Sequence, residues 1–165
     1  MISEDKAIET QKLEQSLCLI KESPVLSWHF LKNLDKPKWF PKIKDNVIKS
    51  IVELEKDRAI KFQLLSYFEK CADKYSDGIV PLIAQLEKNT QNYNILSDLV
   101  KTLGKLKPKR KKNIELLWEV FSKLTEHQHS WVRREIPQAL LPFVEYNIDK
   151  VLEILEKIFF VLMKI

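Results

Sequence analysis

The chain has 165 residues, 28 of them lysine or arginine and 23 of them aspartate or glutamate, and a formal net charge of +5. This length suffices for one domain with a sizeable hydrophobic core. Only two glycines occur, Gly78 and Gly104. Their scarcity disfavours tight hairpins and glycine-built phosphate loops, whereas the abundance of leucine, isoleucine, lysine and glutamate favours helices.

The start of the chain, MISEDKAIETQK, lacks the apolar run of a signal peptide. The longest apolar run, from Ile158 to Met163, is much shorter than a bilayer span. Cys18 and Cys71 are not arranged as C-x-x-C and are typical of reduced core thiols in an intracellular protein. We therefore expect a cytoplasmic protein without a membrane span.

Apolar residues recur at helical spacing almost throughout, and no strict alternation suggests a sheet. The pattern predicts a first helix over 4–21 and a second that starts at Pro24, a residue suited to the first helical turn. Two prolines in DKPKWFPKIKD then permit only a short turn of helix, which carries Trp39.

Between 46 and 75 the pattern predicts two helices, because the apolar stripe changes phase near 56–58. Helices then follow each other at short intervals, so that neighbours must lie antiparallel. We predict one helix capped by Asp77, one over 93–106, one opened by Pro108, one capped by Ser130 and one capped by Asn147.

Isoleucines open three of these helices at Ile79, Ile114 and Ile148, separated by 35 and 34 residues. A fixed period of this length is typical of stacked helix pairs, in which each pair buries the apolar face of its neighbour. We predict a single domain, with irregular helices over 1–58 and repeats over 59–165. A four-helix bundle is the rival, but it does not account for the period.

The segment HSWVRREIPQALLPFVEYNIDKVLEILEKI resembles a HEAT repeat. It has a Val-Arg pair (Val132, Arg133) inside the first helix, a proline (Pro137) that bends it, and an aspartate (Asp149) in the turn to a leucine-rich second helix. The resemblance implies an all-α, right-handed α-α superhelix of about four antiparallel helix pairs, with first helices on the convex face and second helices on the concave face. The upstream repeats share only its period and hydrophobicity.

Both ends suggest a larger context. FLKNLDKPKWFPKIKD resembles a segment that opens helical-repeat regions in large multidomain bacterial proteins, some of them linked to antiviral defence. The apolar C-terminal stretch KIFFVLMKI lacks the polar outer face of a terminal repeat. It predicts either further repeats beyond this chain or self-association through the last helix.

No motif for catalysis is present: there is no G-x-S-x-G elbow, Walker sequence or dinucleotide fingerprint. His127 and His129 are two residues apart and have no further ligands at zinc-site spacing, so they read as loop residues. We predict a protein that is not an enzyme and has no catalytic, metal or cofactor-binding residues.

One cluster accounts for the basicity, because the rest of the chain carries 22 basic and 23 acidic residues. This basic turn is formed by Lys105, Lys107, Lys109, Arg110, Lys111 and Lys112. It is either a solvated loop or a site for an acidic protein surface, a membrane surface or a nucleic acid.

The leading hypothesis is a protein-protein interaction scaffold that binds a protein partner or an adjoining domain, because the expected concave helices carry charges of both signs. We expect the basic turn, Trp39 and Arg134 to contact the partner. The alternatives are a nucleic-acid-binding protein that uses the basic turn, and a regulatory module of a larger, defence-type protein.

Overall fold

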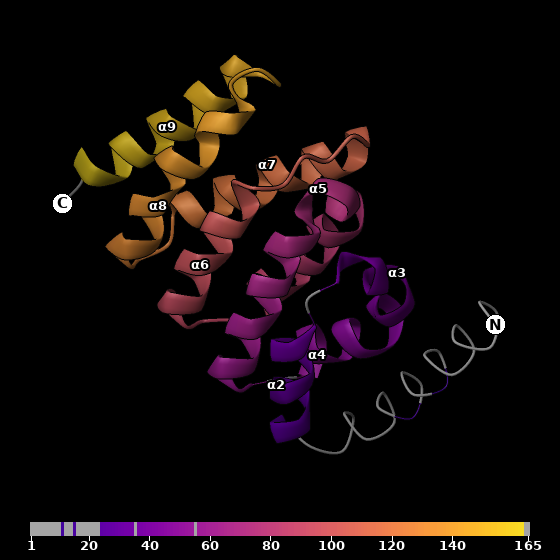
Figure 1. Cartoon of the computed structure of the whole chain (residues 1–165). Coiled ribbons are helices and arrows are strands. Elements are labelled where there is room, and N and C mark those ends of the chain that lie inside the picture. Colours follow the sequence, from indigo (N-terminus) through magenta and orange to yellow (C-terminus); the bar gives the residue numbers. More distant parts are fainter. Residues whose placement is uncertain (1–10, 12–14, 16–23, 35, 55, 164–165) are drawn as a thin grey trace.

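The computed structural model of the chain describes residues 11, 15, 24–34, 36–54 and 56–163, and every regular element within them is helical (Figure 1). The all-α prediction is thus confirmed for these residues. Apart from residues 11 and 15, the predicted helix over 4–21, with Cys18, lies outside them. No helix in the described ranges has the length and apolarity that crossing a membrane requires.

The N-terminal part consists of short helical pieces, as its prolines predicted. These are α2 (Pro24–Asn33), the 3-10 turn η1 (Pro37–Trp39), α3 (Phe40–Ile43), the π-helical turn η2 (Lys44–Ile48) and α4 (Lys49–Leu54). Elements α2, η1 and α4 pack against α5. Phe40 anchors this part in the core, because its ring is buried and stacks on Tyr75 of α5 with centroids 5.3 Å apart.

Helix α5 (Arg58–Lys88) begins where the apolar stripe changes phase, and the side chain of Asp57 caps it by accepting from the amides of Ala59 and Ile60. The backbone of Tyr75 is not helical (φ −127°, ψ 19°) and kinks the helix into two halves. The kink explains the prediction of a new helix at Asp77. Asp77, however, does not cap its own helix, because its carboxylate accepts bonds from the basic turn instead.

The remaining helices are α6 (Tyr93–Leu103), α7 (Lys111–Thr125), α8 (Ser130–Leu140) and α9 (Ile148–Met163), with a 3-10 turn, η3 (Leu141–Phe143), after α8. Two of the predicted starts were wrong. The α7 helix begins at Lys111 and not at Pro108, and His129 rather than Ser130 caps α8 by accepting from the Trp131 amide. Asn147 precedes α9 and accepts from the Lys150 amide, as predicted.

Equivalent positions recur in the three first helices, which are the first half of α5, α6 and α8. Their side-chain caps are Asp57, Asn92 and His129, separated by 35 and 37 residues. The same spacing relates their buried apolar residues, which are Ile60, Ile95 and Val132, then Leu64, Leu99 and Ile136, then Phe68, Leu103 and Leu140. Each first helix therefore buries the same face.

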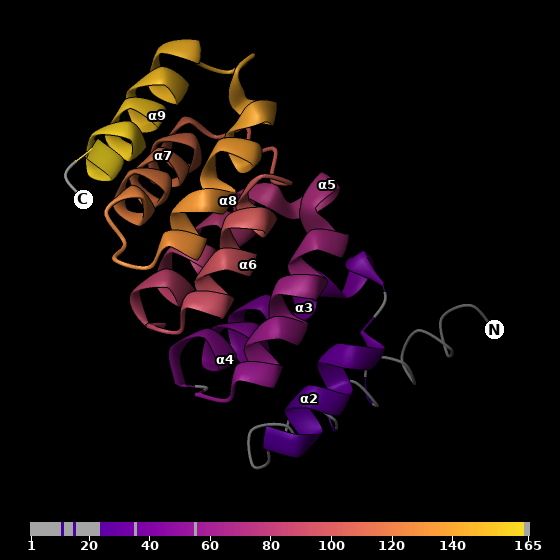
Figure 2. The ribbon, with the colours of Figure 1, turned by 90° about the vertical axis from the view of Figure 1, so that its left-hand side faces the viewer.

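The helices are layered in sequence order, from the N-terminal pieces at one end to α9 at the other (Figures 1 and 2). Helix α6 packs against α5 and α8, and α7 packs against α5, α8 and α9. One continuous cluster of buried apolar side chains extends from Leu31 to Ile158.

Gly104 permits the close approach of α6 and α8. A Cβ atom on this glycine would lie 2.8 Å from the Cα atom of Ala139. Gly104 is the C-cap of α6. Its φ of −61° is nevertheless ordinary, so the packing of α8 rather than backbone freedom requires a glycine here.

Candidate functional site

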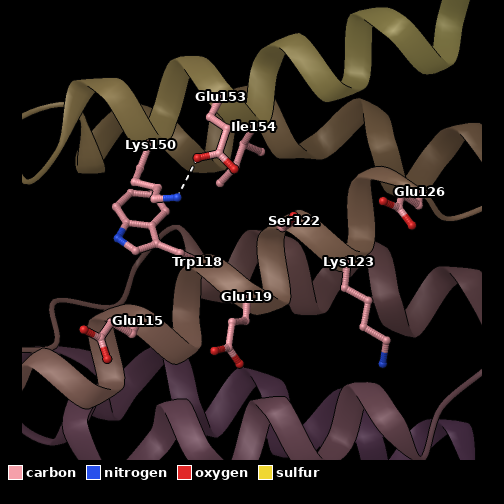
Figure 3. Close-up of a pocket in the computed structure, with 9 residues that line it drawn as sticks. All are labelled: Glu115, Trp118, Glu119, Ser122, Lys123, Glu126, Lys150, Glu153 and Ile154. Atoms are coloured by element: carbon pink, nitrogen blue, oxygen red, sulfur yellow. Dashed lines mark hydrogen bonds and ion pairs between the residues drawn. The ribbon is translucent and has the colours of Figure 1, made fainter.

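A cavity of about 520 Å³ opens between α7 and α9, which are consecutive second helices of the stack (Figure 3). We call it the α7/α9 groove. The side chains that line it are Glu115, Trp118, Glu119, Ser122 and Lys123 from α7 with its C-cap Glu126, and Lys150, Glu153 and Ile154 from α9. The spacing of three or four residues places the six side chains of α7 and its C-cap along one helix face.

Apolar packing fixes the floor of the groove. Trp118 is only 8% exposed, and its ring meets the Phe143 ring edge to face with centroids 5.6 Å apart. Ile154 is also buried. The small exposed part of the Trp118 ring, held in a fixed orientation, is the rigid apolar surface that the groove offers to a partner.

Both lysines of the groove are already bound to carboxylates. The Lys150 ammonium lies 2.5 Å from a Glu153 carboxylate oxygen, as the dashed line in Figure 3 marks. Lys123 binds Glu87 of α5 at 2.7 Å. Lys157 joins α9 to α7, because it binds Glu153 at 3.3 Å and the Ser122 hydroxyl at 2.7 Å.

These bonds determine the charge of the groove. The hydrogen bonds from Lys150 and Lys157 lower the pKa of Glu153 below its ordinary value, so its charge persists and is compensated. Within the described residues, no cation lies within ion-pair distance of Glu119 or Glu126. Glu115 has only Lys111, at 3.9 Å, and both are exposed. The uncompensated charge of the groove is therefore negative.

The basic turn is attached to an acidic stripe on α5 formed by Glu69, Asp73 and Asp77. Lys105 binds Glu69, and Lys107 lies 3.5 Å from Asp73. Because the three acids are spaced four residues apart, they follow one face of α5. Two of the six predicted basic residues thus hold the turn to the fold.

Asp77 completes this attachment through the backbone of the turn. Its carboxylate accepts from the amides of Lys109 (3.2 Å) and Arg110 (3.0 Å) and from Asn113 Nδ2 (2.8 Å). Partial burial would raise the pKa of Asp77, but the bonds from Asn113 and from the two amides outweigh burial and lower this pKa. The side chains of Lys109, Arg110, Lys111 and Lys112 are exposed.

The other two predicted contact residues lie at opposite ends of the stack. Trp39 is half-buried in η1, and the ammonium groups of Lys38 and Lys42 lie 4.8 and 5.1 Å from the centre of its ring. Arg134 is exposed on α8, beside a second cavity of about 320 Å³ that Trp131, Pro137 and Leu162 also line. The structure therefore does not unite Trp39 and Arg134 in one site.

The two histidines have local structural contacts. His127 Nδ1 accepts from the His129 amide at 3.1 Å, and the His129 ring stacks on Tyr93 with centroids 3.8 Å apart. Arg133 is buried and donates from one Nη atom to the carbonyl oxygens of His127 and Gln128. Within the described part of the chain, no group of three or more His, Cys, Asp or Glu side chains could hold a metal ion.

Sequence reasoning missed the α7/α9 groove. The mixed charges of the second helices were visible, but the pairs that compensate them connect residues far apart in the chain, such as Lys123 and Glu87, 36 positions apart. The period of the repeat was the one signal that could have placed such residues side by side. Comparison with known proteins gave no match to any protein family, curated protein or solved structure.

Proposed function

We propose that this chain is a non-enzymatic protein-interaction module built as a HEAT-like solenoid. In this proposal the helix pairs form a right-handed α-α superhelix whose second helices (the second half of α5, α7 and α9) line the binding side. The recurrence of caps and buried residues at 35 and 37 positions supports it. The packing of α6 on α8 and of α7 on α9 supports it as well.

One observation carries the proposal: the α7/α9 groove has a tryptophan at its floor, and in its wall Glu119 and Glu126 have no ion-pair partner among the described residues. The exposed edge of the fixed Trp118 ring provides an apolar contact, and carboxylates without a cation partner among the described residues select a basic side chain. The ligand that fits is a segment with lysine or arginine next to an apolar residue. It belongs either to another protein or to an adjoining domain of a longer one.

Nucleic-acid binding through the basic turn has less support. Lys105 and Lys107 each have an acidic partner on α5, and the neighbouring carboxylates would repel phosphates. We expect no salt-dependent binding of duplex DNA by the wild-type chain. If such binding occurs and is lost when Lys109, Arg110, Lys111 and Lys112 are all replaced by glutamate, the nucleic-acid alternative is correct.

A peptide titration tests the groove. The probe is a peptide of about twelve residues that alternates lysine and leucine, with glutamate-leucine and glutamine-leucine peptides as controls. Binding is followed through the NMR signal of the Trp118 indole, which the Trp118→Phe variant identifies. We expect only the lysine-leucine peptide to shift this signal.

Matched charge reversals locate the binding. In the Glu119→Lys/Glu126→Lys variant, we expect the affinity for the lysine-leucine peptide to fall at least about tenfold. Glu53→Lys/Glu145→Lys makes the same change of net charge at two exposed glutamates outside the groove, and should bind as the wild type does. Equal loss in both variants would show non-specific attraction and refute the groove.

A further inference from the structure

The helix pair α8/α9 exposes residues at positions that are buried in the preceding pair, α6/α7. Trp118 and Phe121 of α7 are buried because the Phe143 ring packs on both, with centroids 5.6 and 5.8 Å away. The residues 34 positions later are Leu152 and Leu155 of α9. Leu152 is 50% exposed, whereas Trp118 is 8% exposed. The α9 face thus lacks the cover that the equivalent α7 face has.

Apolar residues form a straight row along the outer side of α9, beside the exposed Phe160 and Met163. Ile148, Leu152, Leu155, Phe159 and Leu162 follow one another at intervals of four, three, four and three residues. This 3.5-residue period is that of a helix that packs along another helix. In this row only Leu155 is half-buried against the core, and the other four residues are exposed. We call the row the outer seam. The adjacent stripe, formed by Val151, Ile154 and Ile158, is already buried in the fold.

Helix α8 extends the uncovered face. Its exposed residues Arg134 and Pro137 lie 37 positions after Ser97 and Val100 of α6, which are buried at 6% and 0% exposure. Leu141, which follows α8, is 59% exposed. An apolar face that extends over two helices and continues into an exposed tryptophan, Trp131, is typical of a protein interface.

Opposite charges border this face on its two sides. Arg134 lies on the α8 side, next to the cavity that Leu162 lines. Glu156 and Asp149 follow the outer seam on the side of α9 away from Ile158, as their helical positions dictate. Among the described residues, none of these three charged groups has an oppositely charged group within ion-pair distance.

We propose that this face binds the same face of a second copy of the chain. The two copies are related by a twofold axis that runs along α9, so that the two α9 helices lie parallel with outer seam against outer seam. Rotation about such an axis exchanges the two borders. Arg134 of each copy then faces the partner's Glu156.

The charges select this arrangement over the other twofold pairing. An axis across α9 would make the helices antiparallel and place Glu156 opposite the partner's Glu156. Like charges directly opposed at an interface are destabilising. The outer seam itself is roughly 20 Å long, which gives three to four helical turns of contact.

Sedimentation analysis of the whole chain tests the proposal. We expect the wild type to be a dimer that dissociates on dilution. Leu152→Glu places a charge in the outer seam and should leave only monomers. Because this residue is exposed, folding should persist, and circular dichroism checks that it does. A wild type that is monomeric up to about 200 µM overturns the proposal.

A charge exchange tests the geometry. Arg134→Glu and Glu156→Arg should each weaken dimerisation at least about tenfold, and the double variant should restore it to near the wild-type value. Lys112→Glu and Glu53→Arg, at exposed positions away from this face, are the matched controls and should leave it unchanged. A dimer that the single reversals do not weaken, or that the double variant does not restore, contradicts the pairing of Arg134 with Glu156.

Discussion

The Asp77 carboxylate accepts a hydrogen bond of 2.8 Å from Asn113 Nδ2, and the Asp77 carbonyl oxygen accepts another of 2.9 Å from the same nitrogen. One asparagine near the start of α7 thus binds both the side chain and the backbone of α5 at its kink. Because the amides of Lys109 and Arg110 bind the same carboxylate, Asp77 fixes the position of the basic turn and the start of α7 together.

We predict that Asp77→Asn lowers the free energy of unfolding by about 1 kcal/mol at pH 7, the typical cost of losing a charged capping group. The pKa of Asp77 is lowered in the folded state, so the carboxylate stabilises the fold above the unfolded pKa of about 3.9. This contribution is lost as the pH falls through the folded pKa. Urea unfolding at several pH values should therefore show that the difference in unfolding free energy between the wild type and Asp77→Asn disappears below about pH 4. The exposed Asp45→Asn is the control, and a difference that does not vary with pH contradicts the prediction.

Gly104→Ala should destabilise the fold by about 1–3 kcal/mol, the cost of overpacking. Its new Cβ would lie 2.8 Å from the backbone of Ala139, so α6 and α8 would have to separate. Gly78→Ala is the matched comparison, because its nearest neighbour at 3.0 Å is an atom of the Phe40 ring rather than backbone. Thermal unfolding should show a clearly lower midpoint for Gly104→Ala. Equal effects would mean that close packing of α6 on α8 is not what Gly104 provides.

The Cys71 thiol should react slowly with a thiol reagent in the folded protein. Cys71 is 0% exposed. Burial raises its pKa and outweighs the hydrogen bond with Tyr67, which lowers it. Little thiolate is therefore present at pH 8, and the reagent cannot reach it. The measurement uses a Cys18→Ser variant, so that only Cys71 is counted. Labelling should become fast once urea unfolds the chain, and fast labelling without urea would contradict the burial of this residue.

Much of the fold could be predicted because it rests on local signals. The prolines at 24, 37 and 41, the phase change near 56–58 and the cap at Asn147 each act within a few residues of the element they define. The starts of α7 and α8 were misplaced because tertiary contacts decide them. Asp77, more than 30 positions away, holds the turn before α7, and His129 caps α8 while stacking on Tyr93.

The candidate site was less predictable, because its properties depend on which charges remain unpaired. Six lysines and arginines in one turn predict a basic surface, yet Lys105 and Lys107 lie beside acids of α5. Glu119 looks like any solvated glutamate in the sequence. Its significance comes from α9, which lines the other side of the groove while no cation of the described residues pairs with Glu119. Such pairings become visible only when the stacking register of the helices is known.

Arg133 illustrates how the repeat tolerates different side chains at one buried position. The equivalent residues are Lys61 in α5 and Leu96 in α6, and all three are between 2% and 6% exposed. Lys61 donates to the Asn89 carbonyl at the end of α5, and Arg133 donates to the carbonyls of His127 and Gln128 after α7. The two cations thus satisfy carbonyl groups at the C-cap of α5 and in the connection that follows α7.

Arg133→Met should therefore cost less than Arg133→Ala. Methionine keeps the apolar stem that packs where Leu96 packs in α6, and it removes a guanidinium whose Nε atom is buried without a partner in the described part of the chain. Alanine loses the stem as well as the bonds to the two carbonyls. We expect unfolding free energies lower by about 1 kcal/mol for methionine and about 3 kcal/mol for alanine. The exposed Gln138→Ala in the same helix should change little, and equal losses for methionine and alanine would show that the bonds to the carbonyls, rather than packing, determine the role of Arg133.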